Sequence, residues 1–293
     1  MSTSVFISNN FITAVSGICK NQGAGIKVCV KVPIQEGLII NGVIMNEEAL
    51  VASLKNLWAE NPALGGSASL VVSSSSVLSK RLLVPNDSDK KIMANIRDEY
   101  AEVENYDKLV YDYRVLNPKH NGGGMDVLSC AAERDFIEGY VSLFNKAGIK
   151  LTSINTELSS AIDAVKLLPK LSHRTYILAN IDGNNLSSML FVNGEYYYYS
   201  RSRLLEETSS ADSVLEISRL FMSLIQFNKS QKTGFDITDI LFSGDLFDGM
   251  EEFSQSISQA VGVNVSAVST PTKVVMPANA GFAESLYAIG NLI

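Results

Sequence analysis

The clearest hydrophobic pattern in the chain lies between residues 174 and 205, where apolar runs alternate with short polar turns. Three runs are present, at residues 175–181, 187–192 and 195–202. Asn193-Gly194 separates the last two, and this pair between β-prone runs favours a tight hairpin because both residues tolerate positive φ. The pattern therefore predicts a three-stranded antiparallel meander.

The beginning of the chain repeats this rhythm. Short apolar runs occupy residues 4–8, 11–20 and 26–32. Asn9-Asn10 separates the first two, and in the third Val28, Val30 and Val32 alternate with polar positions, as in a strand with one buried face. A second three-stranded meander is predicted here.

Helix and strand patterns follow each meander in the same order. The first is followed by a helix over 47–61, which Asn46 caps, and by a strand over 68–72. The second is followed by elements at residues 211–229 (helix), 237–242 (strand), 246–260 (helix) and 263–268 (strand). This order predicts a duplicated α/β unit, although the two copies share almost no sequence identity.

An insertion with its own pattern interrupts the first copy. Residues 80–149 read as a βαββα module: a strand ending at Pro85, a helix beginning at Asp87 or Ser88, strands at 109–116 and 127–131, and a helix closed by Gly148. We therefore expect a first domain at 1–173 that contains this module, a second domain at 174–276, and a C-terminal helix at 277–293 that returns to the first domain.

Composition narrows the class of protein. The chain has 293 residues, 46% hydrophobic and 19% charged, with a net charge of −7. These values are typical of a folded globular protein, and the acidic balance argues against nucleic-acid binding, which needs a basic face. We expect no nucleic-acid partner.

The few cysteines and histidines favour neither a disulfide framework nor a metal site. Cys19, Cys29 and Cys130 read as buried thiols of a reducing compartment, and His120 and His173 as loop residues. No segment has the pattern of a signal peptide or of a membrane span. We therefore expect a cytoplasmic protein with no direct membrane insertion.

Candidate chemistry is sparse and centres on the first turn of each meander. Phosphate-binding turns need glycine, so that backbone N–H groups can approach an anion, and an acid to hold Mg²⁺. The first turn offers only Asn9 and Asn10, whereas the second offers Asp182, Gly183 and Asn184. Ordinary turn chemistry is the favoured interpretation of the second.

Two further positions could contact a nucleotide. Gly244 follows a predicted strand in a Ser-Gly-Asp turn, where a base or ribose could lie. Glu216, on the helix predicted at 211–229 after the second meander, could meet a ribose hydroxyl. A plain strand-to-helix connection and a solvated charge are the alternative interpretations.

Several segments together resemble the PilM-type proteins of type IV pilus assembly. They are residues 37–42, 50–58, 71–72, 80–85, 112–116, 128–132, 146–149, 216–220 and 241–244. The resemblance implies an actin-like, FtsA-related fold in which two domains flank an ATP-binding cleft. It also implies a groove on the first domain that grips the cytoplasmic tail of the membrane protein PilN.

The chain departs from that family where phosphate would bind. The family's Asp-x-Gly-Ser turn is replaced by Ser8, Asn9 and Asn10, and its second Asp-x-Gly by residues 180–182. Its Gly-Gly turn becomes Gly244-Asp245. We therefore interpret the nucleotide site as degenerate, expect no cofactor, and expect any binding of ATP and Mg²⁺ to be weak.

These observations favour a cytoplasmic scaffold of type IV pilus or related secretion assembly, held at the inner face of the membrane by a PilN-like tail within the assembly platform. The alternatives are an active actin-fold ATPase and, third, a kinase-like phosphotransferase. The groove is expected where the inserted module meets the first domain, lined by Leu82, Val84, Leu109 and Tyr111.

Overall fold

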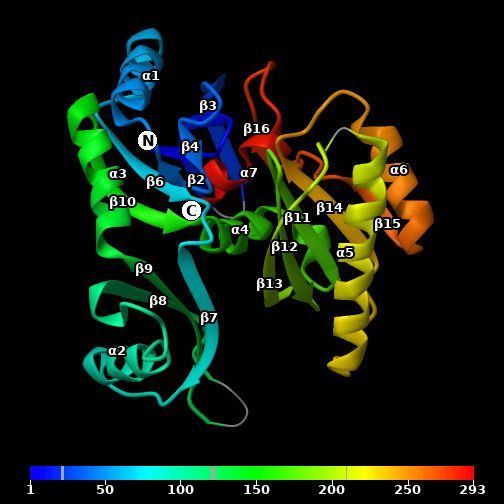
Figure 1. Ribbon diagram of the computed structural model, residues 1–293. Coiled ribbons are helices and arrows are strands. Elements are labelled where there is room, and N and C mark those ends of the chain that lie inside the picture. The colour runs from blue at the N-terminus through cyan, green and yellow to red at the C-terminus, as the bar shows by residue number, and fades with distance from the viewer. Residues whose placement is uncertain (21–22, 120–122, 209) are drawn as a thin grey trace.

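The computed structural model describes residues 1–20, 23–119, 123–208 and 210–293. Its first half is built on a six-stranded sheet with the order β10-β6-β1-β2-β3-β16 (Figure 1). The strands are β1 (Ser2–Ile7), β2 (Phe11–Lys20), β3 (Gly23–Pro33), β6 (Ser67–Val72), β10 (Lys150–Thr156) and β16 (Val274–Val275). β1, β2 and β3 form the predicted antiparallel meander, and β6 and β10 add to it in parallel.

The second half repeats this topology in a five-stranded sheet with the order β13-β12-β11-β14-β15. The strands are β11 (Tyr176–Asp182), β12 (Asn185–Val192), β13 (Glu195–Arg203), β14 (Asp239–Gly244) and β15 (Asn264–Ala267). Asn193 and Gly194 both have positive φ, at 50° and 79°, as the predicted tight turn requires. The predicted duplicated α/β fold is thus confirmed.

Helices cover the sheets in layers. α1 (Glu47–Glu60), whose N-cap is Asn46, and α3 (Arg134–Ala147) pack on one face of the first sheet. α4 (Glu157–Ala164) and α7 (Phe282–Gly290) lie between the two sheets, and α5 (Ala211–Ser230) and α6 (Met250–Val261) cover the outer face of the second. A hairpin that the pattern did not predict, β4 (Ile39–Ile40) with β5 (Val43–Ile44), precedes α1.

The C-terminal helix is shorter than the predicted 277–293 and belongs to both halves. α7 contacts α4, β1 and β2, and also β14 of the second sheet. A Cβ on Gly290 would lie 2.1 Å from the carbonyl oxygen of Ser160, so the two helices cross at glycine. α7 therefore joins the two sheets into one core.

The inserted segment forms a separate three-stranded sheet with the order β7-β9-β8. Its elements are β7 (Val77–Val84), α2 (Asp89–Asp98), β8 (Leu109–Asn117) and β9 (Met125–Glu133). We call these four elements the inserted subdomain. α2 covers one face of the sheet, and the other face is tied to α4 by Arg114, whose guanidinium meets the Asp163 carboxylate at 2.8 Å.

The second helix of the predicted βαββα module does not pack on this sheet. The buried stripe of α3, Tyr140, Leu143 and Phe144, joins the core beneath α1 instead. The Tyr140 hydroxyl donates a hydrogen bond to the carbonyl oxygen of Gly42 at 2.6 Å. An apolar stripe shows that a helix is buried but not against which sheet, which explains the error.

Other differences are at element ends. The helix predicted from residue 246 begins at Met250, because Gly249 ahead of it adopts a left-handed φ of 92°. α4 ends at Ala164 and continues directly into a short 3₁₀ turn at Val165–Leu167. His120 lies outside the described residues. None of the described helices is long and apolar enough to cross a membrane.

Candidate functional site

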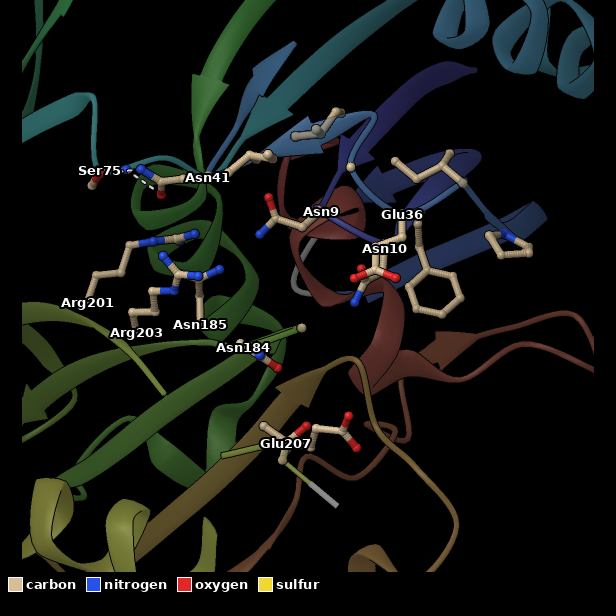
Figure 2. A pocket seen from close by; sticks show the side chains of 18 residues that line it. Asn9, Asn10, Glu36, Asn41, Ser75, Asn184, Asn185, Arg201, Arg203 and Glu207 are labelled. Carbon is tan, nitrogen blue, oxygen red and sulfur yellow. Dashed lines mark hydrogen bonds between the residues drawn. The ribbon is translucent and has the colours of Figure 1, made fainter. Parts of the chain in front are cut away.

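A cleft of about 920 Å³ lies between the two halves, where the β1–β2 turn faces the β11–β12 turn (Figure 2). Asn9 and Asn10 come from the first turn, and Gly183 and Asn184 from the second. Four of the predicted nucleotide-contacting residues are therefore brought together, although they are more than 170 positions apart in sequence. Arg201 and Arg203 of β13 line the cleft beside them.

The two turns are hydrogen-bonded to each other across the cleft. The backbone N–H of Asn9 donates to Oδ1 of Asp182 at 2.8 Å, and Nδ2 of Asn9 donates to Oδ2 at 2.9 Å. We call this pair of bonds the turn clasp. A turn N–H that could bind a phosphate oxygen is therefore already bound to a carboxylate oxygen of the same chain.

The carboxyl group of the clasp is buried, and burial destabilises its ionised form. Asp182 is 1% exposed. Burial raises the pKa of Asp182 to about 7, because hydrogen bonds from Asn9 only partly offset the loss of water and the nearby Asp245 carboxylate adds repulsion. The Asp182 carboxyl group is therefore partly protonated at neutral pH.

A buried arginine lies behind the clasp. Nη2 of Arg201 is 3.5 Å from Oδ2 of Asp182, and Nη1 is 3.4 Å from Oε2 of Glu157. Burial alone would lower the pKa of Arg201, but the attraction of Glu157, followed by other partners including Asp182, outweighs it and the pKa is raised. Asn180 donates to the other Glu157 oxygen at 2.9 Å, so both carboxylate oxygens of Glu157 have partners.

Sequence reasoning missed Arg201 and Glu157. The available signals were two charged residues inside apolar surroundings: an arginine on the alternating strand β13, and an acid in the first turn of a short helix that is otherwise buried. Charged residues are almost never fully buried unless they are paired. The position of neither residue in the sequence indicates that Arg201 and Glu157 are partners.

Gly244 and Asp245 support the second turn from below. Gly244 has φ of 92°, and a Cβ there would lie 2.1 Å from Oδ1 of Asn180. Oδ2 of Asp245 accepts the Gly183 N–H at 3.2 Å, and Lys31 is 3.3 Å from Oδ1. Burial raises the pKa of Asp245, against the lowering effect of Lys31. Gly244 and Asp245 therefore hold the turn in place from outside the cleft lining.

Glu216 lies away from the cleft. Its carboxylate accepts the backbone N–H groups of Leu205 at 3.1 Å and of Glu206 at 3.4 Å. Glu216 therefore ties the segment after β13 to α5, and its contact with a ribose hydroxyl stays a prediction. No group of His, Cys, Asp and Glu within the described residues could hold a metal ion.

The predicted partner-binding residues lie on the face of the inserted sheet that α2 covers. Leu82, Val84, Leu109 and Tyr111 all point towards α2 and pack in the core of the subdomain. Val84 is 4% exposed and Leu109 is 8% exposed. The alternating pattern indicated one buried face correctly, but that face is covered by α2 and is not an open groove.

A groove lies on the opposite face of the inserted sheet, where this sheet meets α4 and the second sheet and not, as predicted, the first domain alone. It has a volume of about 660 Å³ and is bounded by Leu116 of β8, Ile162 of α4 and Tyr196 of β13. Arg81 of β7 closes one side, with its Nη1 donating to the Tyr196 carbonyl oxygen at 2.8 Å and its Nη2 2.9 Å from Asp126. We call this the junction groove. It is mostly apolar in its walls and polar at its rim.

Solved structures share this fold. The chain has a TM-score of 0.82 and 15% identity to the PilM-PilN type IV pilus biogenesis complex, covering 99% of this chain and 97% of that chain. The cytoplasmic domain of EpsL, an inner-membrane component of the type II secretion system of Vibrio cholerae, matches at TM-score 0.54 and 9% identity, covering 99% and 94%. A Bacteroides thetaiotaomicron protein with an actin-like ATPase fold and unknown function matches at 0.54 and 10%, covering 99% and 95%.

The fold is therefore actin-like, as the resemblance implied. No match was found among curated proteins. The family model described as type IV pilus assembly protein PilM matches residues 5–217, which is most of the chain. The chain belongs to the PilM family of type IV pilus assembly proteins.

Proposed function

We propose that this protein is a non-catalytic scaffold of the pilus assembly platform, which recruits a PilN-like membrane protein by its cytoplasmic tail and does not depend on ATP. Membership of the PilM family supports the role in pilus assembly. The similar solved structure is a PilM-PilN complex, which supports a partner of that kind. Through the partner, the protein is held at the inner face of the membrane.

The turn clasp carries the nucleotide part of the proposal. ATP phosphates would have to displace the Asp182 carboxylate from the backbone N–H of Asn9, or bind next to it. A carboxylate beside a triphosphate repels it, and the N–H of Gly183, the glycine of the second turn, already donates to Asp245. Among the described residues, Arg201 forms ion pairs with the Glu157 and Asp182 carboxylates, so its charge is already neutralised within the protein.

The junction groove is the proposed site for the tail. A groove where subdomains meet suits an extended peptide, and its apolar walls would bury alternate side chains. Binding that rests on apolar contacts is expected to change little with salt concentration. The proposed site differs from the predicted one: it lies on the face of the inserted sheet opposite α2, where that sheet meets α4 and the second sheet.

Two neighbouring residues on β8 provide the test. Leu116 lines the junction groove, whereas Val115 is on the other face and is 44% exposed. Titration of a labelled PilN-type tail peptide should show at least tenfold weaker binding to Leu116→Asp and unchanged binding to Val115→Asp. Circular dichroism and thermal unfolding check that both variants are folded. Equal affinity of the two variants would place the tail elsewhere.

The ATPase alternative has one observation in its favour. The cleft of about 920 Å³ is large enough for a nucleotide, and small-molecule sites commonly have volumes of this order. Calorimetry with Mg²⁺-ATP separates the two functions. We expect no micromolar binding by the wild type, and micromolar affinity would favour the ATPase.

A further inference from the structure

A further pocket lies on the side of the second sheet that faces α4, away from the cleft. This pocket of about 450 Å³ is bounded by the linker around Leu168 and Leu171, by Leu241 of β14, and by the loop that follows β15. We propose that this pocket and the outer edge of β15 together bind an extended, acidic peptide of a protein partner, which adds a strand to the second sheet and inserts one apolar side chain into the pocket.

The edge of the sheet is available for such a strand. β15 is the last strand in the order of the second sheet, and within the described chain no strand pairs with its outer side. The N–H of Val268 bonds to Phe242 of β14 at 2.9 Å. Because backbone groups alternate in direction along a strand, the N–H and C=O of Ala267 point outward, where a peptide can pair with them.

The register places the side chain of an added strand in the pocket. Ser266 pairs with Leu241, and both side chains line the pocket. Residues that are directly opposite each other on neighbouring strands share a face of the sheet. A peptide residue opposite Ser266 therefore directs its side chain to the face that holds the pocket.

The interior of the pocket suits an apolar side chain. Leu167 and Val268 are buried in the core between the two sheets, at 1% and 5% exposure, and Pro169 and Pro271 complete the walls. These prolines carry no N–H group that would need a hydrogen-bond partner. A leucine or isoleucine side chain entering here would exchange water for apolar contacts.

The charge around the pocket selects an acidic peptide. The lining contains Lys170, Arg174 and Lys273 and no acidic residue, although the whole chain has a net charge of −7. Arg174 is 2.9 Å from Asp239, whereas the ion pairs within the described residues include neither lysine. Complementary charge of this kind sets the choice of partner and the association rate.

The pocket is distinct from both sites described above. The cleft is lined by the turn that follows β11, whereas this pocket is lined by the linker that precedes β11. Only the linker residues around Leu168 are shared with the junction groove. The linker before β11 and the loop after β15 both connect the two halves of the molecule (Figure 1). A bound peptide would therefore contact both connections.

The test uses a labelled heptapeptide, Thr-Glu-Thr-Leu-Thr-Glu-Thr, in which both glutamates lie on the same side of a strand as the central leucine. Its counterpart has lysine in place of glutamate. Fluorescence anisotropy should show at least tenfold tighter binding of the acidic peptide. The double variant Lys170→Glu with Lys273→Glu should reverse this preference, and Lys229→Glu on exposed α5 should leave it unchanged.

The strand edge is tested separately. Ala267→Pro removes the outward N–H and leaves the bonds to β14, so it should weaken the acidic peptide at least tenfold; the charge-reversal pair decides the matter if this variant does not fold. Equal affinity for the two peptides, or chemical-shift changes that avoid residues 266–273, would overturn the proposal. A dimer of the chain that the lysine variant dissociates would also overturn it, since a second copy would then be the occupant. Leu116→Asp should not affect this binding, which separates it from the tail.

Discussion

The two hairpin turns that face each other across the cleft occupy equivalent positions in the duplicated fold, yet their chemistry is opposite. The β1–β2 turn presents donors, the N–H and the side-chain amide of Asn9. The β11–β12 turn presents an acceptor, the carboxylate of Asp182. If both turns presented N–H donors, they would need a bound anion to accept their hydrogen bonds. A turn with donors and a turn with an acceptor can instead form hydrogen bonds with each other. The duplication therefore brings together two turns that bond to each other without a ligand.

The strand residues next to the two turns also differ, and a substitution there should have the largest effect on stability. Val72 pairs with Ile7 next to the first turn, whereas Gly244 pairs with Ile181 next to the second. Gly244→Ala should destabilise the protein by about 3 kcal/mol, because a left-handed φ and a clash with Asn180 add together.

Gly249→Ala is the matched control for this prediction. Gly249 has the same φ of 92°, but its Cβ would meet no atom closer than 3.9 Å. Only the backbone penalty of about 1 kcal/mol is expected. Urea unfolding measures both variants, and equal losses would show that the close approach to Asn180 does not constrain the second turn.

The acceptor turn should make stability depend on pH. The pKa of Asp182 is about 7 in the folded protein against an ordinary value of 3.8. A raised pKa means that the folded state binds the proton more tightly than the unfolded state. The contribution of Asp182 to stability is therefore greatest below about pH 4, declines as pH rises towards 7, and then remains constant. The full difference is up to about 4 kcal/mol.

Asp182→Asn should remove this dependence. Oδ1 of Asn9 has no hydrogen-bond partner among the described residues. The side-chain amide of Asn9 can therefore rotate so that Oδ1 accepts a hydrogen bond from the amide of the introduced asparagine. Unfolding at pH 5 and pH 8 should show a smaller decline for the variant than for the wild type. An identical decline would assign the pH dependence to other groups, such as Asp245.

The smallest effect is expected from the two asparagine side chains that line the cleft from opposite turns. Asn9→Ala removes one bond to Asp182 and should cost about 1 kcal/mol. Asn184→Ala removes an exposed side chain and should change stability by less than about 0.5 kcal/mol. Thermal unfolding at neutral pH compares them. Losses of equal size would mean that the clasp depends on the backbone N–H of Asn9 alone.

Much of the fold could be predicted because its signals are local. The Asn193-Gly194 turn, the Asn46 cap and the closing Gly148 each act within a few residues. The order of such elements was enough to reveal the duplication. Element ends were less predictable, since a single left-handed glycine moved the start of α6.

The site could be predicted only in part, because its contacts join distant positions. Asn9 and Asp182 were both recognised as turn residues, but no pattern shows that they bond to each other across 173 positions. The alternation of Leu82 and Val84 indicated a buried face but not the helix that covers it. Arg201 and Glu157 are hidden for the same reason, since a buried charge is explained only by its partner.

The position of α7 between the two sheets has a consequence for synthesis. α7 follows every other described helix and strand, yet nearly all its residues are buried against elements made earlier. On the ribosome, the parts of the inner sheet faces that α7 covers, beside α4, therefore stay exposed until this helix emerges. During that interval the nascent chain exposes apolar surface, the condition in which large proteins aggregate or bind chaperones.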